Sequence, residues 1–406
     1  MSSAIIPHHA FPPNPSSFPT CTSMNNLLCI NAGGLGDLHG LRLRRLTDRM
    51  EANISVFDVD KSESRWANSR AIWNRLQERD WDLVYLESTG IAAGIPLILA
   101  RHLWGQRFVV SSGDPVSGYV HTVHGRVAGA AAGAYERLLY RASTGFIGWT
   151  PYLTGRALQL GAPRGVTVEG AVDLNLFRPF ESAERAAARA HFGLPADHLV
   201  CGVVGSLQWT PRQQYCYGLE LIEMMKYLKR PDVSVLIVGD GTGRARLESR
   251  VPASLRDRVM FTGRVPEGDV VRALNAMDVG FITQTLDGLG SYRLTTKLPE
   301  YLATGLPVAM SPIPGLYDYA SDCGWALPPL HPATDTFHQG CAALVERLTP
   351  DAIARRASAA RSVAETHFDY ELLRPRFQAF LGDLLHHPHS SAPHPQPSRR
   401  NAVVPH

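Results

Sequence analysis

The chain has 406 residues, of which 45% are hydrophobic and 19% are charged, and its formal net charge is +3 at pH 7. This composition is typical of a soluble globular protein and excludes a disordered or fibrous one, while the length predicts about two to three domains. The net charge is too small to indicate nucleic acid as a partner, and it fits an enzyme that binds a phosphate-bearing ligand at one local site. No apolar run reaches the roughly 18 to 20 residues that a membrane-spanning helix needs.

The two ends of the chain differ in composition from the rest. Residues 1–23 are rich in Pro, Ser and His and lack the basic start and apolar stretch of a secretory signal, so we expect a disordered extension. Met24 stands directly before the first predicted strand, and translation could start at Met1 or at Met24. Residues 386–406 have a similar composition and predict a disordered tail. The six cysteines form no CxxC pair or Cys/His cluster, which favours reduced thiols in the cytoplasm over a zinc site or a disulfide framework.

Short apolar runs alternate with helical patterns along the chain. Strands of a first unit are predicted at residues 27–31, 54–57, 83–86, 108–110, 146–147 and 166–168. Strands of a second unit are predicted at residues 199–204, 233–238, 259–261, 279–282 and 307–310. This alternation predicts the α/β class, with βα units and two largely parallel, doubly wound sheets. We expect the units to join near residues 173–179, and a last helix at residues 370–385 to cross back to the first unit.

The first motif, residues 31–37, follows the first strand and opens a helix. Gly33 and Gly34 could let the backbone approach a phosphate or a sugar, although a tight structural turn also needs glycines. The spacing is not that of the GxGxxG dinucleotide motif. The helix carries three arginines that could face anionic lipid or simply solvent, namely Arg42, Arg44 and Arg45.

The second motif, residues 205–212, follows the first strand of the second unit and begins with Gly205 and Ser206. A loop at this position points toward the ligand side of a doubly wound sheet. Arg212 could pair with a diphosphate through its planar guanidinium group, and the alternative is an ordinary surface arginine.

The third motif, residues 295–305, is TTKLPEYLATG. Thr295 and Thr296 stand where a helix begins, and with Lys297 they could hold a diphosphate. Glu300, one turn later, could accept hydrogen bonds from ribose hydroxyls. The alternative is a capped helix with a Lys–Glu pair worth a few tenths of a kcal/mol.

Taken in order, five segments of the chain resemble the large retaining GT-B family often called family four, the glycosyl transferases of group 1. The segments are residues 170–179, 238–241, 261–265, 276–279 and 297–308. The resemblance implies two Rossmann-like domains that face a central cleft. It implies an acceptor domain at residues 24–178, a nucleotide-sugar domain at 179–368 and a crossing-back helix at 369–385. The backbone at Arg264 and Val265 would then read the base.

This sequence departs from the family pattern at three positions. The family's donor motif pairs two glutamates eight residues apart; Glu300 is the second, and Tyr292 stands where the first is expected. Ser206 replaces an arginine of the second motif, which leaves Arg212 as the nearest cation. Asn31 replaces the lysine of the similar loop in glycogen synthases, which argues against a glucan synthase.

The region of the family's catalytic histidine corresponds here to residues 111–119, SSGDPVSGY. Asp114 is therefore the candidate that orients or deprotonates an acceptor hydroxyl, with His121 and His124 behind it. An Asp in a Gly-Asp-Pro turn is the structural alternative, since Asp and Pro are ordinary turn formers.

The sequence thus predicts transfer of a sugar from a nucleoside diphosphate to a hydroxyl acceptor with retained anomeric configuration. The acceptor could be a glycan, a lipid-linked sugar or a small molecule. The resemblance implies no metal and no cofactor, and the expected location is the cytoplasm, with peripheral membrane contact as an option. Two other functions stay open: a GT-B scaffold that has lost catalysis and serves as a partner subunit, and a sugar-nucleotide epimerase.

Overall fold

The computed structural model describes residues 24–386, so the predicted extension at 1–23 and the tail after His386 lie outside the described residues. The first sheet has six parallel strands in the order β2-β1-β3-β4-β5-β6. The strands are β1 Asn26–Asn31, β2 Asn53–Asp58, β3 Leu83–Glu87, β4 Phe108–Ser112, β5 Gly145–Gly148 and β6 Gly165–Thr167. The helices are α1 Leu38–Thr47, α2 Arg65–Gln77, α3 Ile91–Trp104, α4 Val116–His124, α5 Arg126–Ala142 and α6 Pro151–Gln159.

The second sheet also has six parallel strands, in the order β12-β11-β10-β7-β8-β9. They are β7 Leu199–Val204, β8 Val233–Val238, β9 Val259–Gly263, β10 Val279–Ile282, β11 Val308–Met310 and β12 Gly324–Ala326. The helices are α7 Ser182–His191, α8 Leu219–Met225, α9 Arg244–Arg250, α10 Glu267–Ala276, α11 Lys297–Ala303, α12 Pro314–Tyr319, α13 Asp335–Glu346, α14 Pro350–His367 and α15 Tyr370–His386. Two short 3-10 helices complete the set, η1 Ala253–Arg258 and η2 Gly290–Tyr292.

The predicted α/β class with two doubly wound sheets is confirmed. Strands β3 and β8 are buried along their whole length, as expected where helices cover both faces of a parallel sheet. The order of strands reverses between β1 and β3 in the first sheet and between β7 and β10 in the second. Ligands of such sheets bind beyond the carboxyl ends of the strands at these points, so both sheets place their ligand side toward the same region.

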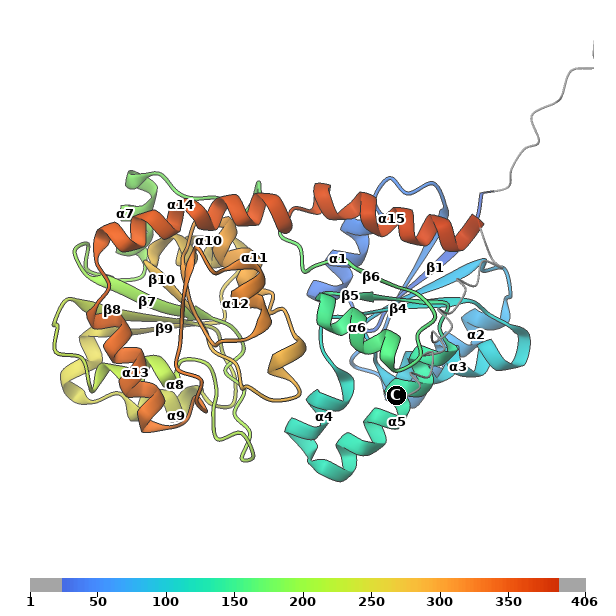
Figure 1. The fold of residues 1–406 in the computed structure, drawn as a ribbon, viewed down its shortest axis with the longest axis horizontal. Helices are drawn as coiled ribbons and strands as arrows, with labels where there is room; N and C mark the ends of the chain where they lie inside the picture. The colour runs from blue at the N-terminus through green and yellow to red at the C-terminus, as the bar shows by residue number, and fades with distance from the viewer. Residues whose placement is uncertain (1–23, 387–406) are drawn as a thin grey trace, which may run out of the picture.

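Helices α14 and α15 connect the two halves, and Figure 1 shows them as one band that runs along both domains. The chain returns at Phe368, whose carbonyl accepts a hydrogen bond of 2.9 Å from the amide of Val172. From there α15 packs on the first sheet, where Phe377 is fully buried and meets Tyr85 edge to face at 5.1 Å. Each such buried side chain stabilises the packing by about 1.5–3 kcal/mol, so the end of the chain is anchored to its beginning.

None of the helices within residues 24–386 is both long enough and apolar enough to cross a membrane. Arg42 does not face lipid, contrary to one option for the arginines of α1. Its side chain is 2% exposed, and its guanidinium group donates hydrogen bonds of 2.6 and 2.7 Å to the carbonyls of Glu169 and Val168. Arg44 pairs with Asp58 at 2.6 Å, so this row of arginines ties elements of the chain together.

An interdomain cavity as the candidate active site

A cavity of about 790 Å³ lies between the two domains, and we call it the interdomain cavity. Its first-domain wall comes from the segments that follow β1, β2, β3 and β4, with Trp149 after β5, and its second-domain wall from Tyr217 and residues 293–297. The volume is within the usual range of about 300–1,000 Å³ for small-molecule sites. The cavity therefore lies where both strand orders direct a ligand.

Lys297 begins α11 and supplies a buried positive charge to this cavity. Its Nζ lies 3.6 Å from the ring centroid of Tyr217, and its side chain is 9% exposed. Burial alone would raise the pKa of Tyr217, but the positive charges of Lys297 and Arg293 outweigh it and hold that pKa below its usual value. Within the described residues, no carboxylate lies within ion-pair distance of Lys297. A buried cation without a counter-ion favours an anionic ligand.

Gly205 allows Lys297 to lie where it does. A Cβ atom at Gly205 would stand 2.8 Å from Cε of Lys297, and φ of Gly205 is +159°, at the edge of the region that favours glycine. The neighbouring Ser206 is exposed and does not line the interdomain cavity. Gly205 is thus needed for the close approach of a backbone to the cation.

The hydroxyl groups at the start of α11 do not act as helix caps. Thr296 occupies the N-cap position without a side-chain cap hydrogen bond. Thr295 is 5% exposed, and its Oγ1 has no hydrogen-bond partner in the described part of the chain. Both residues line the interdomain cavity, and no ion pair joins Lys297 to Glu300. The alternative of a simply capped helix with a Lys–Glu pair is therefore not what the structure has.

Glu300 lies one turn further along α11, outside the lining of the interdomain cavity. Burial raises the pKa of its carboxyl group to about 7, Glu267 raises it further and Lys297 opposes the increase. Part of the residue still touches solvent, so protein atoms surround the carboxyl group without sealing it.

The glycine-rich ends of β7, β8 and β9 pack backbone to backbone. The amide of Gly239 donates to the carbonyl of Gly263 at 2.9 Å, and a Cβ at Gly239 would stand only 1.9 Å from the carbonyl oxygen of Gly205. Arg264 is exposed and Val265 half-buried at the same edge of the sheet. The structure thus brings these separately predicted motifs together, beside the interdomain cavity rather than within its lining.

Asp114 lines the interdomain cavity but is already engaged by an arginine of the other domain. Arg293 approaches it with Nε 2.8 Å from Oδ1, and its second nitrogen donates to Oδ2 at 3.2 Å. Both carboxylate oxygens of Asp114 therefore already have a partner from the second domain. Sequence reasoning missed Arg293, because the partner that explains it is 179 positions away in the chain.

One predicted site residue, Arg212, and one departure, Tyr292, have structural roles of their own. The exposed guanidinium group of Arg212 lies against Gly125, between α4 and α5, and does not line the interdomain cavity. The ring of Tyr292 lies 5.4 Å from the guanidinium carbon of Arg156, and its carbonyl accepts a hydrogen bond of 2.7 Å from Thr150. Tyr292 therefore binds the two domains together and does not replace the expected glutamate.

Gly33 and Gly34 form a turn that Asn31 stabilises. The side chain of Asn31 accepts from the amide of Gly33 at 3.0 Å and donates to the carbonyl of Gly34 at 2.8 Å. Gly34 has φ of +84°. Neither glycine lines the interdomain cavity, whereas Ala32 and Asp37 on either side of them do. The tight turn after β1 is thus the structural reason for these two glycines.

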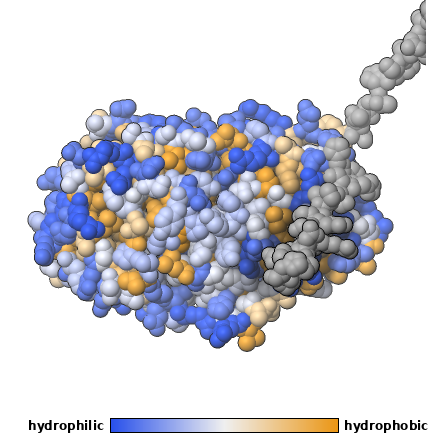
Figure 2. Space-filling model, viewed as in Figure 1, coloured by the Kyte–Doolittle hydropathy of each residue, from blue (hydrophilic) through white to orange (hydrophobic). Residues whose placement is uncertain are grey.

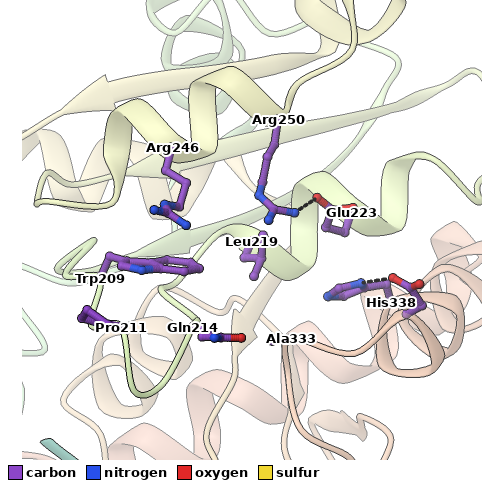
Figure 3. Close-up of a pocket in the computed structure, with 10 residues that line it drawn as sticks. Trp209, Pro211, Gln214, Leu219, Glu223, Arg246, Arg250, Ala333 and His338 are labelled. Carbon is purple, nitrogen blue, oxygen red and sulfur yellow. Dashed lines mark hydrogen bonds and ion pairs between the residues drawn. The ribbon is translucent and has the colours of Figure 1, made fainter.

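A second cavity of about 480 Å³ lies within the second domain, and we call it the side pocket. Figure 3 shows Arg246 stacked on the indole of Trp209, at 4.4 Å from its centroid, and Arg250 directed at Glu223, at 2.9 Å. His338 is 2% exposed, and its Nε2–H donates to the carbonyl of Pro332 at 2.9 Å. Most charged groups of the side pocket thus have partners within their own domain.

Comparison with known proteins agrees with this geometry. Residues 198–347 match the family model described as glycosyl transferases group 1. The chain is 29% identical over 285 residues to the 2-deoxystreptamine glucosyltransferase of Streptomyces kanamyceticus, covering 62% of this chain and 71% of the relative. It is 26% identical over 270 residues to the GDP-mannose-dependent alpha-mannosyltransferase of Mycobacterium tuberculosis, covering 66% and 64%.

Solved structures extend the likeness to almost the whole fold. The Anabaena HepE structure in complex with UDP-glucose superposes with a TM-score of 0.68 at 17% identity, over 89% of this chain and 100% of that one. The sucrose-phosphate synthase of Thermosynechococcus elongatus superposes with a TM-score of 0.70 at 16% identity, over 89% and 99%. The described chain therefore has the GT-B fold. The segment that matches the model of glycosyl transferases group 1, residues 198–347, includes Gly205, Lys297 and Glu300.

Proposed function

We propose that the protein transfers a sugar from a nucleoside diphosphate sugar to a hydroxyl group of an acceptor, with retention of the anomeric configuration and without a metal ion. The observation that carries the proposal is the buried charge of Lys297, which lies against Gly205 and has no carboxylate partner in the described chain. The named relatives use a glucosyl donor and GDP-mannose. The base, the sugar and the acceptor of this chain are open within that class.

In this proposal the second domain binds the donor. Lys297 and the hydroxyl of Thr295 receive the diphosphate, whose negative charge grows as the glycosidic bond breaks, and preorganised donors stabilise such charge strongly. Arg212 does not line the interdomain cavity and Arg293 is paired with Asp114, so Lys297 carries the interaction with the diphosphate that the sequence shared with Arg212. Glu300 accepts hydrogen bonds from the ribose, and the backbone at Arg264 and Val265 contacts the base.

The first domain then receives the acceptor. Asp114, in its ion pair with Arg293, holds the two walls of the interdomain cavity together and excludes water that would otherwise hydrolyse the donor. This wall indicates only that the reacting group of the acceptor is a neutral hydroxyl; it does not indicate what the rest of the acceptor is. A lipid-linked acceptor, and with it a peripheral position at a membrane, remains one option among glycans and small molecules.

A donor panel tests the proposal directly. UDP-glucose, GDP-mannose and ADP-glucose are compared for the increase in melting temperature that each causes, since the true donor stabilises the native state by mass action. Release of nucleoside diphosphate is then measured for the wild type and for Lys297→Ala and Glu300→Ala. Release at the wild-type rate in both variants would sink the assignment.

A catalytically impaired scaffold is the second candidate, because Tyr292 stands where relatives carry a glutamate and packs against Arg156 of the first domain. This candidate predicts tight nucleotide binding without turnover for every acceptor offered. Transfer to any acceptor at a measurable rate, abolished by Lys297→Ala, would rule it out.

A further inference from the structure

A histidine and a fully buried glutamate form part of the first-domain wall of the interdomain cavity. His39, in the first turn of α1, lines this cavity, and its side chain is 29% exposed. Its Nδ1 lies 3.4 Å from Oε1 of Glu87, the last residue of β3, which is 0% exposed. The imidazole ring also leans on the indole of Trp149, with 5.5 Å between the centroids.

Glu87 is held as a carboxylate by the groups around it. Ser111 donates to its Oε1 at 3.3 Å, Tyr85 donates to Oε2, and Nε of Arg42 lies 3.9 Å from Oε2. Burial alone would raise the pKa of Glu87, but the hydrogen bond from His39 and the charge of Arg42 outweigh it and hold that pKa below its usual value. Glu87 is therefore an acceptor, so Nδ1 of His39 must carry the hydrogen of their bond.

This bond determines what His39 offers to a ligand. With the hydrogen on Nδ1, the neutral ring has a lone pair on Nε2, which can only accept a hydrogen bond. Within residues 24–386, no protein group bonds to Nε2. Of the carboxylates that line this wall, Asp114 is paired with Arg293 and Asp37 with Lys61. The wall thus presents an oriented and unused acceptor to the interdomain cavity.

We propose that Nε2 of His39 accepts a hydrogen bond from the attacking hydroxyl group of the acceptor substrate and positions it beside the donor, while Glu87 acts as the positioning residue that fixes the ring. The proposal rests on the proposed function, since it names the group that receives the acceptor in that reaction. It concerns the first domain, outside the matched segment at residues 198–347. A hydroxyl group fits this position, because the lone pair on Nε2 of a neutral imidazole needs a hydrogen-bond donor.

The role predicts a dependence on pH. Burial lowers the pKa of His39, but Glu87 and Asp37 raise it more, and Arg42 opposes them, so that the pKa stands above its usual value. The titratable and charged groups that line the cavity from other elements are Asp60, Lys61, Glu63, Arg65, Asp114, Tyr119, His124, Tyr217, Arg293 and Lys297. The protonated ring has no lone pair left on Nε2. Transfer should therefore fall as the pH decreases through the pKa of His39.

The test compares four variants at several pH values. The donor is whichever of UDP-glucose, GDP-mannose and ADP-glucose stabilises the protein most, and the acceptors are 2-deoxystreptamine and water, the latter measured as release of nucleoside diphosphate. His39→Ala should lower kcat/KM for the acceptor on the order of tenfold to a hundredfold, the loss expected for one hydrogen bond to a buried group. His39→Gln should retain more activity, since its amide oxygen can accept, and should lack the acidic limb of the pH profile.

Glu87→Gln should move the acidic limb to lower pH, because the charge that raises the pKa of His39 is gone. The control is His102→Ala on α3, a histidine bonded to the carbonyl of Ile98 and outside the interdomain cavity, which should leave kcat/KM and the limb unchanged. Thermal unfolding of each variant separates loss of fold from loss of function. Imidazole nitrogen NMR should show the hydrogen of His39 on Nδ1.

The outcomes separate the two proposals. Normal kcat/KM and an unchanged acidic limb in His39→Ala, or a hydrogen on Nε2 in the NMR spectrum, would overturn the role of His39 and leave the proposed function standing. A wild type that neither binds any of the three nucleotide sugars nor releases nucleoside diphosphate would overturn the proposed function itself. Loss in His39→Ala together with the pH shift in Glu87→Gln would support both.

Discussion

The interdomain cavity and the side pocket both contain cations, but they differ in what these cations have as partners. In the side pocket, Arg250 pairs with Glu223, and Arg246 stacks on Trp209. In the interdomain cavity, Lys297 has no carboxylate within ion-pair distance among the described residues, and the hydroxyl of Thr295 is buried without a hydrogen bond. Buried polar groups are costly when unpaired. The clearest difference is between Arg250, whose charge is neutralised by a carboxylate of its own domain, and Lys297, which has only an aromatic ring beside it and therefore favours an anionic ligand.

The distribution of hydrophobic residues over the visible surface does not by itself indicate a binding site. Figure 2 shows hydrophilic residues spread over most of the visible face, with hydrophobic residues in scattered groups between them. Scattered exposed apolar residues are ordinary on globular proteins. The unpaired groups in the interdomain cavity are therefore the more specific signal.

The largest effect is expected from Lys297→Ala. Removing one preorganised charge donor from a developing anion typically lowers kcat by about 10²–10³-fold. The matched control is Lys226→Ala, because Lys226 is paired with Glu223 at 2.7 Å beside the side pocket. Release of nucleoside diphosphate measures both. Equal losses of activity in Lys297→Ala and Lys226→Ala would mean that the lack of a carboxylate partner does not mark Lys297 as a functional residue.

The second effect concerns the ion pair between Asp114 and Arg293. If the pair holds the walls together, Asp114→Asn and Arg293→Gln should each lower kcat/KM on the order of tenfold, and the double variant should lose little more, since groups in one ion pair are not additive. Steady-state kinetics of the three variants form the cycle. A loss in Asp114→Asn a hundred times larger than in Arg293→Gln would instead assign Asp114 a direct role in proton transfer.

A third effect arises from the carboxyl group of Glu300, whose pKa is about 7 in the unliganded protein. Hydrogen bonds from ribose hydroxyls favour the charged form, so nucleotide binding should lower this pKa and release about half a proton at pH 7. Calorimetry in two buffers of different ionisation enthalpy measures the release. Glu300→Gln is the control and should release none.

The same group gives a stability prediction with a definite sign. The pKa of Glu300 is higher in the folded than in the unfolded state, so the folded state binds more protons between about pH 4.5 and 7. The contribution of Glu300 to stability is therefore lost as the pH rises through this window. In Glu300→Gln the unfolding midpoint in denaturant should fall less over this range than in the wild type. A wild type and variant with parallel curves would contradict the raised pKa.

Residues could be predicted from the sequence where their role depends on neighbouring positions in the chain. The glycines at 205, 239 and 263 follow or end strands, and all three have positive φ; at Gly239 a Cβ would also meet the carbonyl oxygen of Gly205. Lys297 was found because it begins a helix after a glycine loop. Strand β12 was missed, since three residues show no periodicity.

The first-domain wall could not be predicted in the same way. His39, Glu87 and Trp149 come from three separate loops or strand ends, and only the order β2-β1-β3-β4-β5 brings them together. No spacing in the sequence marks such a group. Asp114 was found from its place after a strand, but its pairing with Arg293 depends on how the two domains meet. The proposed donor side of the site can thus be predicted from the sequence, whereas the proposed acceptor side depends on how the topology brings separate segments together.

The smallest effect is expected at the side pocket, and it tests the comparison from its other side. In Arg250→Ala, Glu223 keeps its pair with Lys226, so the loss of an exposed ion pair should cost about 0.2–1 kcal/mol of stability. Donor affinity, measured by calorimetry, should not change, because the guanidinium group of Arg250 already has a carboxylate partner in Glu223. Weakening of donor binding by tenfold or more in Arg250→Ala would show that the pocket belongs to the donor site, and that a cation can serve a ligand even while it has a carboxylate partner in the folded chain.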